Sequence, residues 1–311
     1  MASVALPAAL LGADLELEGG ELLVVCGETA SGKTALAVAL ARALDGEIVG
    51  ADSVQVYRGF DIGSGKPTAE ELDGVPHHLL SVADPAEEFH AGRFVALADA
   101  AIAEVRGRGR LPIVCGGTYL WIKALVEGLV EAPPASPSLR AELHAELAER
   151  GAAHLHARLR GVDPASAERL HPNDAVRVVR ALEVHALTGT PLSTLHAAHG
   201  FRTRRLAARL LRVERPREQL ERRIAARVGE MLARGLVDEV RGLLSAGHGA
   251  CKAMRSVGYA ETKAHLEGTL PLAELAPAIV RSTCVFARRQ RTWLARAAAT
   301  VVTSPSSAPS P

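Results

Sequence analysis

The segment GETASGKT at residues 27–34 constrains the fold of this chain more than any other stretch. It fits the pattern G-x-x-x-x-G-K-[ST] at every position, and it joins the apolar run ELLVVC to the helix-forming run KTALAVALARALDG. A glycine-rich loop between a buried strand and a helix cradles phosphate groups with its backbone N–H groups. Residues 29–34 are therefore predicted to wrap a phosphate, with Lys33 neutralising its oxygens and Thr34 holding Mg²⁺.

Strand-like and helix-like patterns alternate over the first 130 residues, and this alternation predicts an α/β fold with a parallel sheet and right-handed crossovers. Helical spacing is evident in 33–46 and 89–109 and in the stretch after Thr118. A further strand is expected at 206–215. Short apolar runs predict the other strands at 21–27, 47–53, 78–82 and 111–118.

The pattern changes at APPASPSLR (132–140), where three prolines fall within six residues. Only helical patterns follow, up to about residue 200. We therefore expect an all-helical insertion domain at 132–204, within a P-loop-type catalytic core built from 21–131 and 205–300.

The two ends of the chain have compositions of their own. Residues 1–20 contain no Lys or Arg, so they are expected to be a short extension and not a secretory signal. The tail 301–311 contains TSPSSAPSP and is expected to be disordered. No apolar run reaches the roughly 18 residues that span a bilayer, so no membrane contact is expected.

Charge is distributed unevenly along the chain. Residues 1–200 hold 16 Lys+Arg against 26 Asp+Glu, whereas residues 201–311 hold 20 against 9. An arginine-rich half suits a polyanionic partner such as RNA, although solvated helix faces would have the same composition. The four cysteines form no CxxC pair, which predicts reduced thiols in a cytoplasmic protein and no zinc module.

Polar residues follow two of the predicted strands, at the sheet edge where open parallel sheets bind ligands. Asp52 and Ser53 end the second strand, and Asp52 is either a general base or metal-shell carboxylate, or a turn cap. Thr118 follows two glycines, and it is either a ligand contact or a helix N-cap. The strand LPIVCGGT lacks the final Asp with which NTPases hold Mg²⁺.

Three stretches carry basic residues that could contact RNA or lie on solvated helix faces. Arg177 and Arg180 are three residues apart on one helical face, and Arg255 stands in RSVGYAE. The third stretch is FARRQRTW (286–293). The residues alone leave both interpretations open.

Taken together, the motifs resemble those of the bacterial tRNA dimethylallyltransferases, also called tRNA isopentenyltransferases. The matching segments run in family order from residue 21 to about 296. They are GETASGKT, DSVQVYRGFDIGSGKP, GVPHHLL, LPIVCGGTYLWIKALVEGL, HPNDAVRVVRALEV, MRSVGY and FARRQRTWL.

The resemblance implies transfer of a dimethylallyl group from dimethylallyl diphosphate to N6 of adenosine 37 in the tRNA anticodon stem-loop, with Mg²⁺ as cofactor and a monomeric enzyme. The phosphate loop would then hold the diphosphate leaving group, and the target nucleotide would be flipped into the pocket. Lys33, Asp52 and Thr118 carry over as catalytic residues. The diphosphate site carries over as Gly27, Glu28, Thr29, Ala30, Ser31, Gly32, Lys33, Thr34 and Arg227. The tRNA contacts carry over as Asp52, Ser53, Val54, Gln55, Thr118, Arg140, Val176, Arg177, Val178, Val179, Arg180, Arg255, Ser256, Val257, Gly258, Tyr259 and Ala260.

The chain departs from the family pattern in four places. Glu28 replaces a usual Pro, and its charge is expected to weaken diphosphate binding unless it points to solvent. GSGKP (63–67) replaces GTAKP, Trp121 replaces Tyr, and Cys284 replaces Arg.

Two other classes of protein compete with this interpretation. A nucleotide or small-molecule kinase would explain the phosphate loop and the sheet, but not the basic half. An RNA-binding NTPase switch would explain the charge asymmetry, but would need the Mg²⁺-holding aspartate that is missing.

Overall fold

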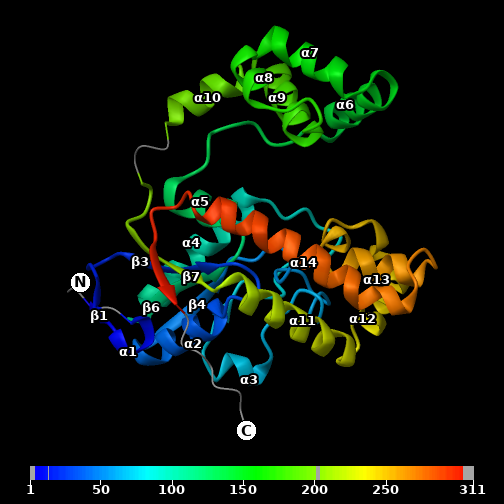
Figure 1. Cartoon of the computed structure of the whole chain (residues 1–311). Coiled ribbons are helices and arrows are strands. Elements are labelled where there is room, and N and C mark those ends of the chain that lie inside the picture. Colours follow the sequence, from blue (N-terminus) through cyan, green and yellow to red (C-terminus); the bar gives the residue numbers. More distant parts are fainter. Residues whose placement is uncertain (1–3, 13, 201–203, 304–311) are drawn as a thin grey trace. The chain divides into compact units, whose positions relative to one another are not determined.

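The computed structural model describes residues 4–12, 14–200 and 204–303 (Figure 1). The chain forms two compact units. The sheet unit consists of Met1–Val126 and Arg205–Pro311, and the helical unit consists of Glu127–Arg204. The predicted insertion at 132–204 lies inside the helical unit.

One six-stranded parallel sheet forms the centre of the sheet unit, in the order β5-β4-β6-β3-β7-β8. The predicted α/β fold with a parallel sheet is therefore confirmed. The phosphate loop follows β3, which pairs with β6 on one side and β7 on the other. The strands are β3 (Leu22–Gly27), β4 (Gly46–Gly50), β5 (His77–His78), β6 (Leu111–Gly116), β7 (Ala208–Glu214) and β8 (Thr300–Thr303).

Helices cover both faces of this sheet, and every residue of β3 is buried. Successive strand side chains point to opposite faces, so Val24 joins one core cluster and Val25 the other. Figure 1 shows α2 (Lys33–Ala43) on one face, with α4 (Ala91–Gly107) and α5 (Tyr119–Glu127) on the other.

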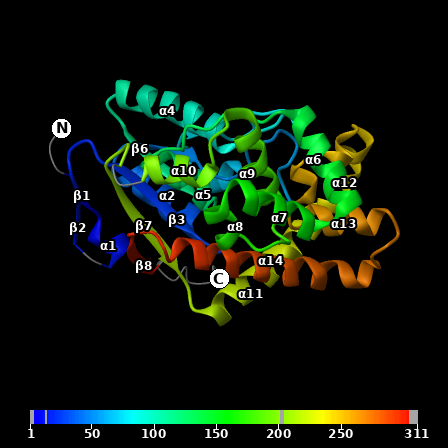
Figure 2. The same ribbon diagram turned by 90° about the horizontal axis from the view of Figure 1, so that it is seen from above.

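The C-terminal helices complete the core on the face of α4 and α5. Figures 1 and 2 show α14 (Leu272–Leu294) running alongside α11 (Arg217–Ala233), and these two helices pack together. No helix of the described residues is long and apolar enough to cross a membrane. The remaining helical elements of this unit are α3 (Ala69–Leu72), α12 (Leu236–Ser245), α13 (Tyr259–Leu266) and the 3₁₀ turns η1 (His248–Ala250) and η2 (Ala253–Arg255).

The N-terminal extension packs against the core. Strands β1 (Val4–Leu6) and β2 (Leu15–Leu17) pair antiparallel around the short helix α1 (Ala8–Leu11). Their buried leucines join the core cluster that includes α2.

The helical unit is built from helices alone over its described residues, and it has an apolar core of its own. Val178 and Val179 belong to that core, because helix periodicity turns both toward the neighbouring helices. The helices are α6 (Pro137–Arg150), α7 (Ala152–Val162), α8 (Pro164–Arg169), α9 (Ala175–Thr188) and α10 (Leu192–His199).

Two local predictions need correction. The strand expected at 78–82 is only β5, because Leu79 and Ser81 adopt positive φ angles of 64° and 53° that end the extended backbone. The tail expected to be disordered from residue 301 begins with β8, which pairs with β7 in parallel. Residues 304–311 lie outside the described residues.

Candidate active site

Two arginines that the sequence did not single out bind carbonyl oxygens of the phosphate loop. Arg215 Nε donates to the carbonyl oxygen of Ser31 at 2.6 Å, and Arg223 Nε donates to that of Ala30 at 3.0 Å. In a trans peptide the carbonyl and the next N–H point in opposite directions. Holding the Ser31 carbonyl outward therefore turns the N–H of Gly32 toward the loop interior.

Two N–H groups of this loop already have protein acceptors. Thr29 donates to Oε1 of Gln290 at 2.8 Å, and Ser31 donates to the carbonyl of Glu28 at 3.2 Å. Of the residues predicted to wrap a phosphate, Thr29 and Ser31 therefore have backbone N–H groups that are already bonded within the protein. Lys33 and Thr34 open α2, where the first-turn N–H groups have no intrahelical acceptor and suit an anion.

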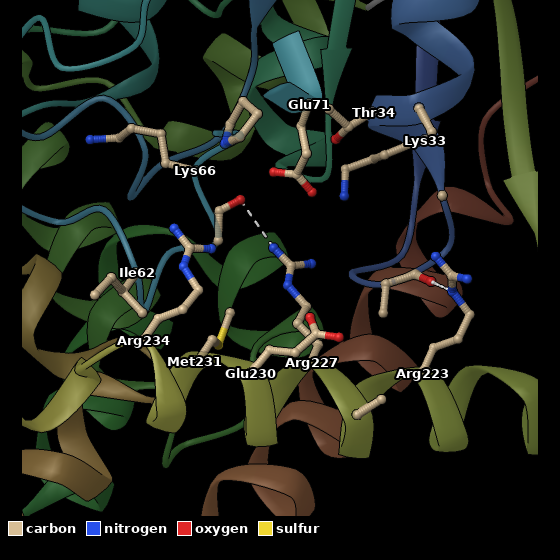
Figure 3. A pocket seen from close by; sticks show the side chains of 16 residues that line it. Lys33, Thr34, Ile62, Lys66, Glu71, Arg223, Arg227, Glu230, Met231 and Arg234 are labelled. Atoms are coloured by element: carbon tan, nitrogen blue, oxygen red, sulfur yellow. Dashed lines mark hydrogen bonds between the residues drawn. The ribbon is translucent and has the colours of Figure 1, made fainter. Parts of the chain in front are cut away.

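Two neighbouring cavities are lined by residues of this loop. The phosphate-side cavity, of about 280 Å³, lies between α2 and α11 (Figure 3). The Asp52-side cavity, of about 360 Å³, extends toward the ends of β4 and β6. The residues common to both are Ala30, Lys33, Thr34, Gly65, Arg227 and Met231.

Lys33 of α2 and Arg227 of α11 point into the phosphate-side cavity from two different helices, as Figure 3 shows. Burial lowers the pKa of both side chains, while the Asp52 carboxylate acts in the opposite direction on each. Lys33 Nζ donates to the carbonyl of Glu28 at 3.4 Å, and Arg227 Nη2 donates to that of Gly65 at 3.0 Å. Five cationic side chains and two carboxylates line this cavity, and this excess of positive charge provides a site for a strongly charged anion. The cations are Lys33, Lys66, Arg223, Arg227 and Arg234, and the carboxylates are those of Glu71 and Glu230.

Asp52 is a turn cap, as one of the two interpretations of the sequence predicted. Its Oδ1 caps the following turn by accepting from the N–H groups of Val54 at 2.9 Å and Gln55 at 3.3 Å. Within the described part of the chain, Oδ2 has no hydrogen-bond partner, and Asp52 lines the Asp52-side cavity. One oxygen thus fixes the carboxylate while the other can accept a proton.

Thr118 lies beside Asp52 because two glycines allow close packing. A Cβ at Gly116 would lie 2.1 Å from the carbonyl oxygen of Ala51, so a side chain there would push β6 and β4 apart. Thr118 Oγ1 accepts from the N–H of Ser53 at 3.1 Å. Its hydroxyl hydrogen can therefore be donated to another group in the cavity.

The predicted MRSVGY segment lines the far wall of the Asp52-side cavity. Arg255, Ser256, Val257 and Gly258 all line it. Tyr259 also lines this cavity, but its ring is buried and its hydroxyl is bonded to Ser64 N and to Glu239. The other predicted residue of this segment, Ala260, lines a separate surface hollow.

The predicted RNA-binding residues of the helical unit divide into three groups. Arg140 and Arg180 bind the buried carboxylate of Glu183, so they support the fold of this unit. Val178 and Val179 lie in its core, and their side chains are removed from the predicted RNA surface. Val176, at 78% exposure, and the exposed Arg177 remain on the outside of α9.

Glu28 does not act as its charge alone predicts. Its carboxylate is turned into the protein, where Arg291 of α14 binds both of its oxygens. The charge that was expected to oppose diphosphate is thereby paired. Cys284, another departure from the family pattern, lines the same small hollow as Glu28 and Arg291.

The remaining departures are also accommodated. Trp121 is buried and stacks on Phe94 with ring centroids 4.7 Å apart. Ser64, in the segment GSGKP, donates its hydroxyl to the carbonyl of Phe60 at 2.6 Å.

Gln290 is a site residue that the sequence analysis missed. The segment FARRQRTW was interpreted through its arginines and its tryptophan. Ala287, Gln290 and Leu294 share the buried face of α14, so one polar residue on an apolar stripe was the available signal.

Comparison with known proteins identifies the family. The family model described as "IPP transferase" matches residues 55–297, and "Isopentenyl transferase" matches residues 20–85. A tRNA dimethylallyltransferase of Sorangium cellulosum is 59% identical, with 92% of this chain and 91% of that protein covered. The tRNA dimethylallyltransferase of Myxococcus xanthus is 47% identical, with 93% and 95% covered.

Solved structures agree with these relatives. The tRNA isopentenylpyrophosphate transferase of Bacillus halodurans matches with a TM-score of 0.66 at 38% identity, covering 92% of this chain and 90% of that one. A eukaryotic dimethylallyltransferase captured acting on tRNA matches with a TM-score of 0.80 at 26% identity, covering 92% and 74%. The chain therefore belongs to the IPP transferase family, among the tRNA dimethylallyltransferases.

Proposed function

We propose that this tRNA dimethylallyltransferase takes its prenyl group from dimethylallyl diphosphate and transfers it to N6 of adenosine 37 in the anticodon stem-loop. One observation carries the proposal. Asp52 and Thr118 lie on one cavity together with Lys33 and Arg227, so a base and a cationic anion site face the same space. Family membership leaves the kinase and NTPase-switch interpretations without support.

The cationic end of the site suits the leaving group. As the C–O bond of the donor breaks, negative charge grows on the diphosphate, and the charges of Lys33 and Arg227 stabilise it. Neither residue needs to move a proton for this step. Because the bond that breaks joins the prenyl carbon to oxygen, the diphosphate stays on the loop and no phosphoryl group reaches the acceptor.

Thr34 is the residue we assign to Mg²⁺. Among the described residues, no cluster of three His, Cys, Asp or Glu side chains could hold a metal alone. This fits Mg²⁺, which keeps several waters and binds through substrate phosphates with few protein ligands. Thr34 lines both cavities, and Glu71 lines the phosphate-side cavity with it. The metal would supply further positive charge to the diphosphate.

Asp52 is placed to activate the nucleophile. As N6 attacks the first carbon of the prenyl group, a C–N bond forms and the C–O bond to diphosphate breaks. The proton leaving N6 passes to Oδ2 of Asp52, while Oδ1 remains fixed by its turn. The hydroxyl of Thr118 donates a hydrogen bond to the bridging oxygen of the departing diphosphate and keeps its proton.

The RNA side of the site is the wall of Arg255, Ser256, Val257 and Gly258. A stacked adenine cannot reach Asp52, so the nucleotide must be flipped out of the anticodon loop to enter. Val176 and Arg177 of the helical unit are proposed as further RNA contacts. That the enzyme is a monomer and acts in the cytoplasm stays a prediction.

The test is transfer of label from radiolabelled dimethylallyl diphosphate to unmodified tRNA in the presence of Mg²⁺. Asp52→Asn keeps an oxygen for the turn and removes the base, so transfer should fall about 10²- to 10⁴-fold. Asp84→Asn, a change at a partly exposed carboxylate paired with Arg58, should leave transfer unchanged. Full activity of Asp52→Asn would sink the base assignment, and no label from wild type would sink the proposed donor.

A further inference from the structure

Gln290 connects two loops of the proposed active site, the phosphate loop and the loop that carries Thr118. Its side-chain Oε1 accepts from the N–H of Thr29 in the phosphate loop at 2.8 Å. Its Nε2 donates to the carbonyl oxygen of Gly117 at 3.1 Å, one residue before Thr118. Gln290 is 8% exposed and lines the Asp52-side cavity, and its bond to Gly117 is buried whereas its bond to Thr29 is partly buried.

The backbone is shaped to admit this side chain. A Cβ at Gly117 would lie 2.4 Å from Nε2 of Gln290, which no ordinary contact allows. The other side of the same loop is held by a backbone hydrogen bond, in which the N–H of Thr118 donates to the carbonyl of Ala51 at 3.3 Å. The Thr118 loop is thereby held between Gln290 and the end of β4.

Gln290 is itself fixed by its neighbour in α14. Arg291 binds both carboxylate oxygens of Glu28, and its Nη2 also donates to the carbonyl of Arg215 at 3.2 Å. Consecutive residues of α14 therefore hold consecutive residues of the phosphate loop. Any displacement of Gln290 relative to that loop would have to break the ion pair as well.

We propose that Gln290 is a positioning residue that sets the phosphate loop and Thr118 at the separation needed for prenyl transfer. This inference rests on the proposed function, in which the loop holds the diphosphate and Thr118 contacts its bridging oxygen. Gln290 itself makes no contact with the reacting atoms in this scheme. Its loss would leave both substrates bound while misaligning the oxygen that must be stabilised as the C–O bond breaks. Misplacement of a reacting group by about 1 Å lowers rates by roughly 10²-fold.

The experiment separates chemistry from binding. Gln290→Met keeps the length of the side chain and removes both hydrogen bonds. We expect its single-turnover transfer rate to fall about 30- to 100-fold, while KM for dimethylallyl diphosphate and for tRNA each changes less than about threefold. Thr292→Val, at an exposed position two residues along the same helix, is the matched control and should behave as wild type.

Gln290→Glu provides a second measurement if the Met variant does not fold. The carboxylate keeps an acceptor for Thr29 but faces the Gly117 carbonyl with no hydrogen, so the transfer rate of the folded variant should again fall. A transfer rate within threefold of wild type in the folded variant would overturn the inference. A loss explained entirely by a raised donor KM would also overturn it, because Gln290 would then only shape the phosphate loop. Absence of transfer by wild type would instead overturn the proposed function.

Discussion

Gly65→Ala should remove Arg227 from the diphosphate site without unfolding the protein. A Cβ at Gly65 would lie 1.5 Å from Nη2 and 2.5 Å from Cζ of Arg227, so the side chain and the guanidinium cannot occupy their present positions together. The guanidinium ends a flexible side chain, so it can withdraw at small cost. Gly65 also has a φ of +61°, and a residue with a Cβ is destabilised there by about 1–2 kcal/mol.

The expected loss of affinity follows from what Arg227 provides. A hydrogen bond to a charged group contributes about 1.5–3 kcal/mol. Since about 1.4 kcal/mol corresponds to a tenfold change, diphosphate affinity should fall roughly 10- to 150-fold. The same factor should appear in KM for dimethylallyl diphosphate, and KM for tRNA should change far less.

Calorimetric titration with inorganic diphosphate and Mg²⁺ measures this directly. Gly65→Ala and Arg227→Met should lose similar affinity, and the double variant should be no weaker than either, because both changes remove one group. Gly74→Ala is the control, since Gly74 has a similar φ of +75° and a Cβ there would meet nothing within 4 Å. Diphosphate binding by Gly65→Ala as tight as that by Gly74→Ala would refute the reasoning.

Two further predictions concern buried carboxylates. The Arg108 guanidinium, with His78 and Arg110, lowers the pKa of Glu47 from 4.5 to about 2. This lowered pKa stabilises the folded state above pH 4.5, and the stabilisation is lost as pH falls toward 2. Over that range, the difference in free energy of unfolding between wild type and Glu47→Gln, measured by urea unfolding, should shrink by about 1–2 kcal/mol once solvent screening is included. Arg291→Met leaves the buried Glu28 carboxylate without its cation and should lower the free energy of unfolding by about 1–3 kcal/mol, against about 1 kcal/mol or less for Glu28→Gln. Equal losses of unfolding free energy in Arg291→Met and Glu28→Gln would contradict this prediction.

Sequence patterns predicted the features that depend on neighbouring residues. The order β3, phosphate loop and α2 follows from an apolar run, a glycine pattern and helical spacing, all within residues 22–43. The short edge strands depend instead on distant partners. β8 consists of the β-branched residues TVVT, and it forms because Thr300–Thr303 pairs with β7, which lies far earlier in the chain.

The groups that the arginines bind could not be predicted from the sequence either. Arg215, Arg223 and Arg291 belong to the basic half that suggested an RNA surface, yet the structure uses them to hold carbonyls and a carboxylate around the phosphate loop. An arginine that binds a carbonyl and one that binds a phosphate have the same sequence signature. Only the fold decides which groups face each guanidinium.

The end of β6 explains how a phosphate loop can serve a reaction that transfers no phosphoryl group. Strand β6 pairs directly with β3, and it ends at Gly116 and is followed by Gly117, where an NTPase would present a carboxylate for Mg²⁺. Gly116 packs against Ala51, and Gly117 admits Gln290, so a side chain at either position would clash. The space beside the phosphate loop is thus given to Gln290 and Thr118, and the nearby carboxylate is Asp52 in the loop after β4. In the proposed reaction, the carboxylate at the end of β4 serves as a base for the incoming amine, whereas the carboxylate of an NTPase would hold Mg²⁺.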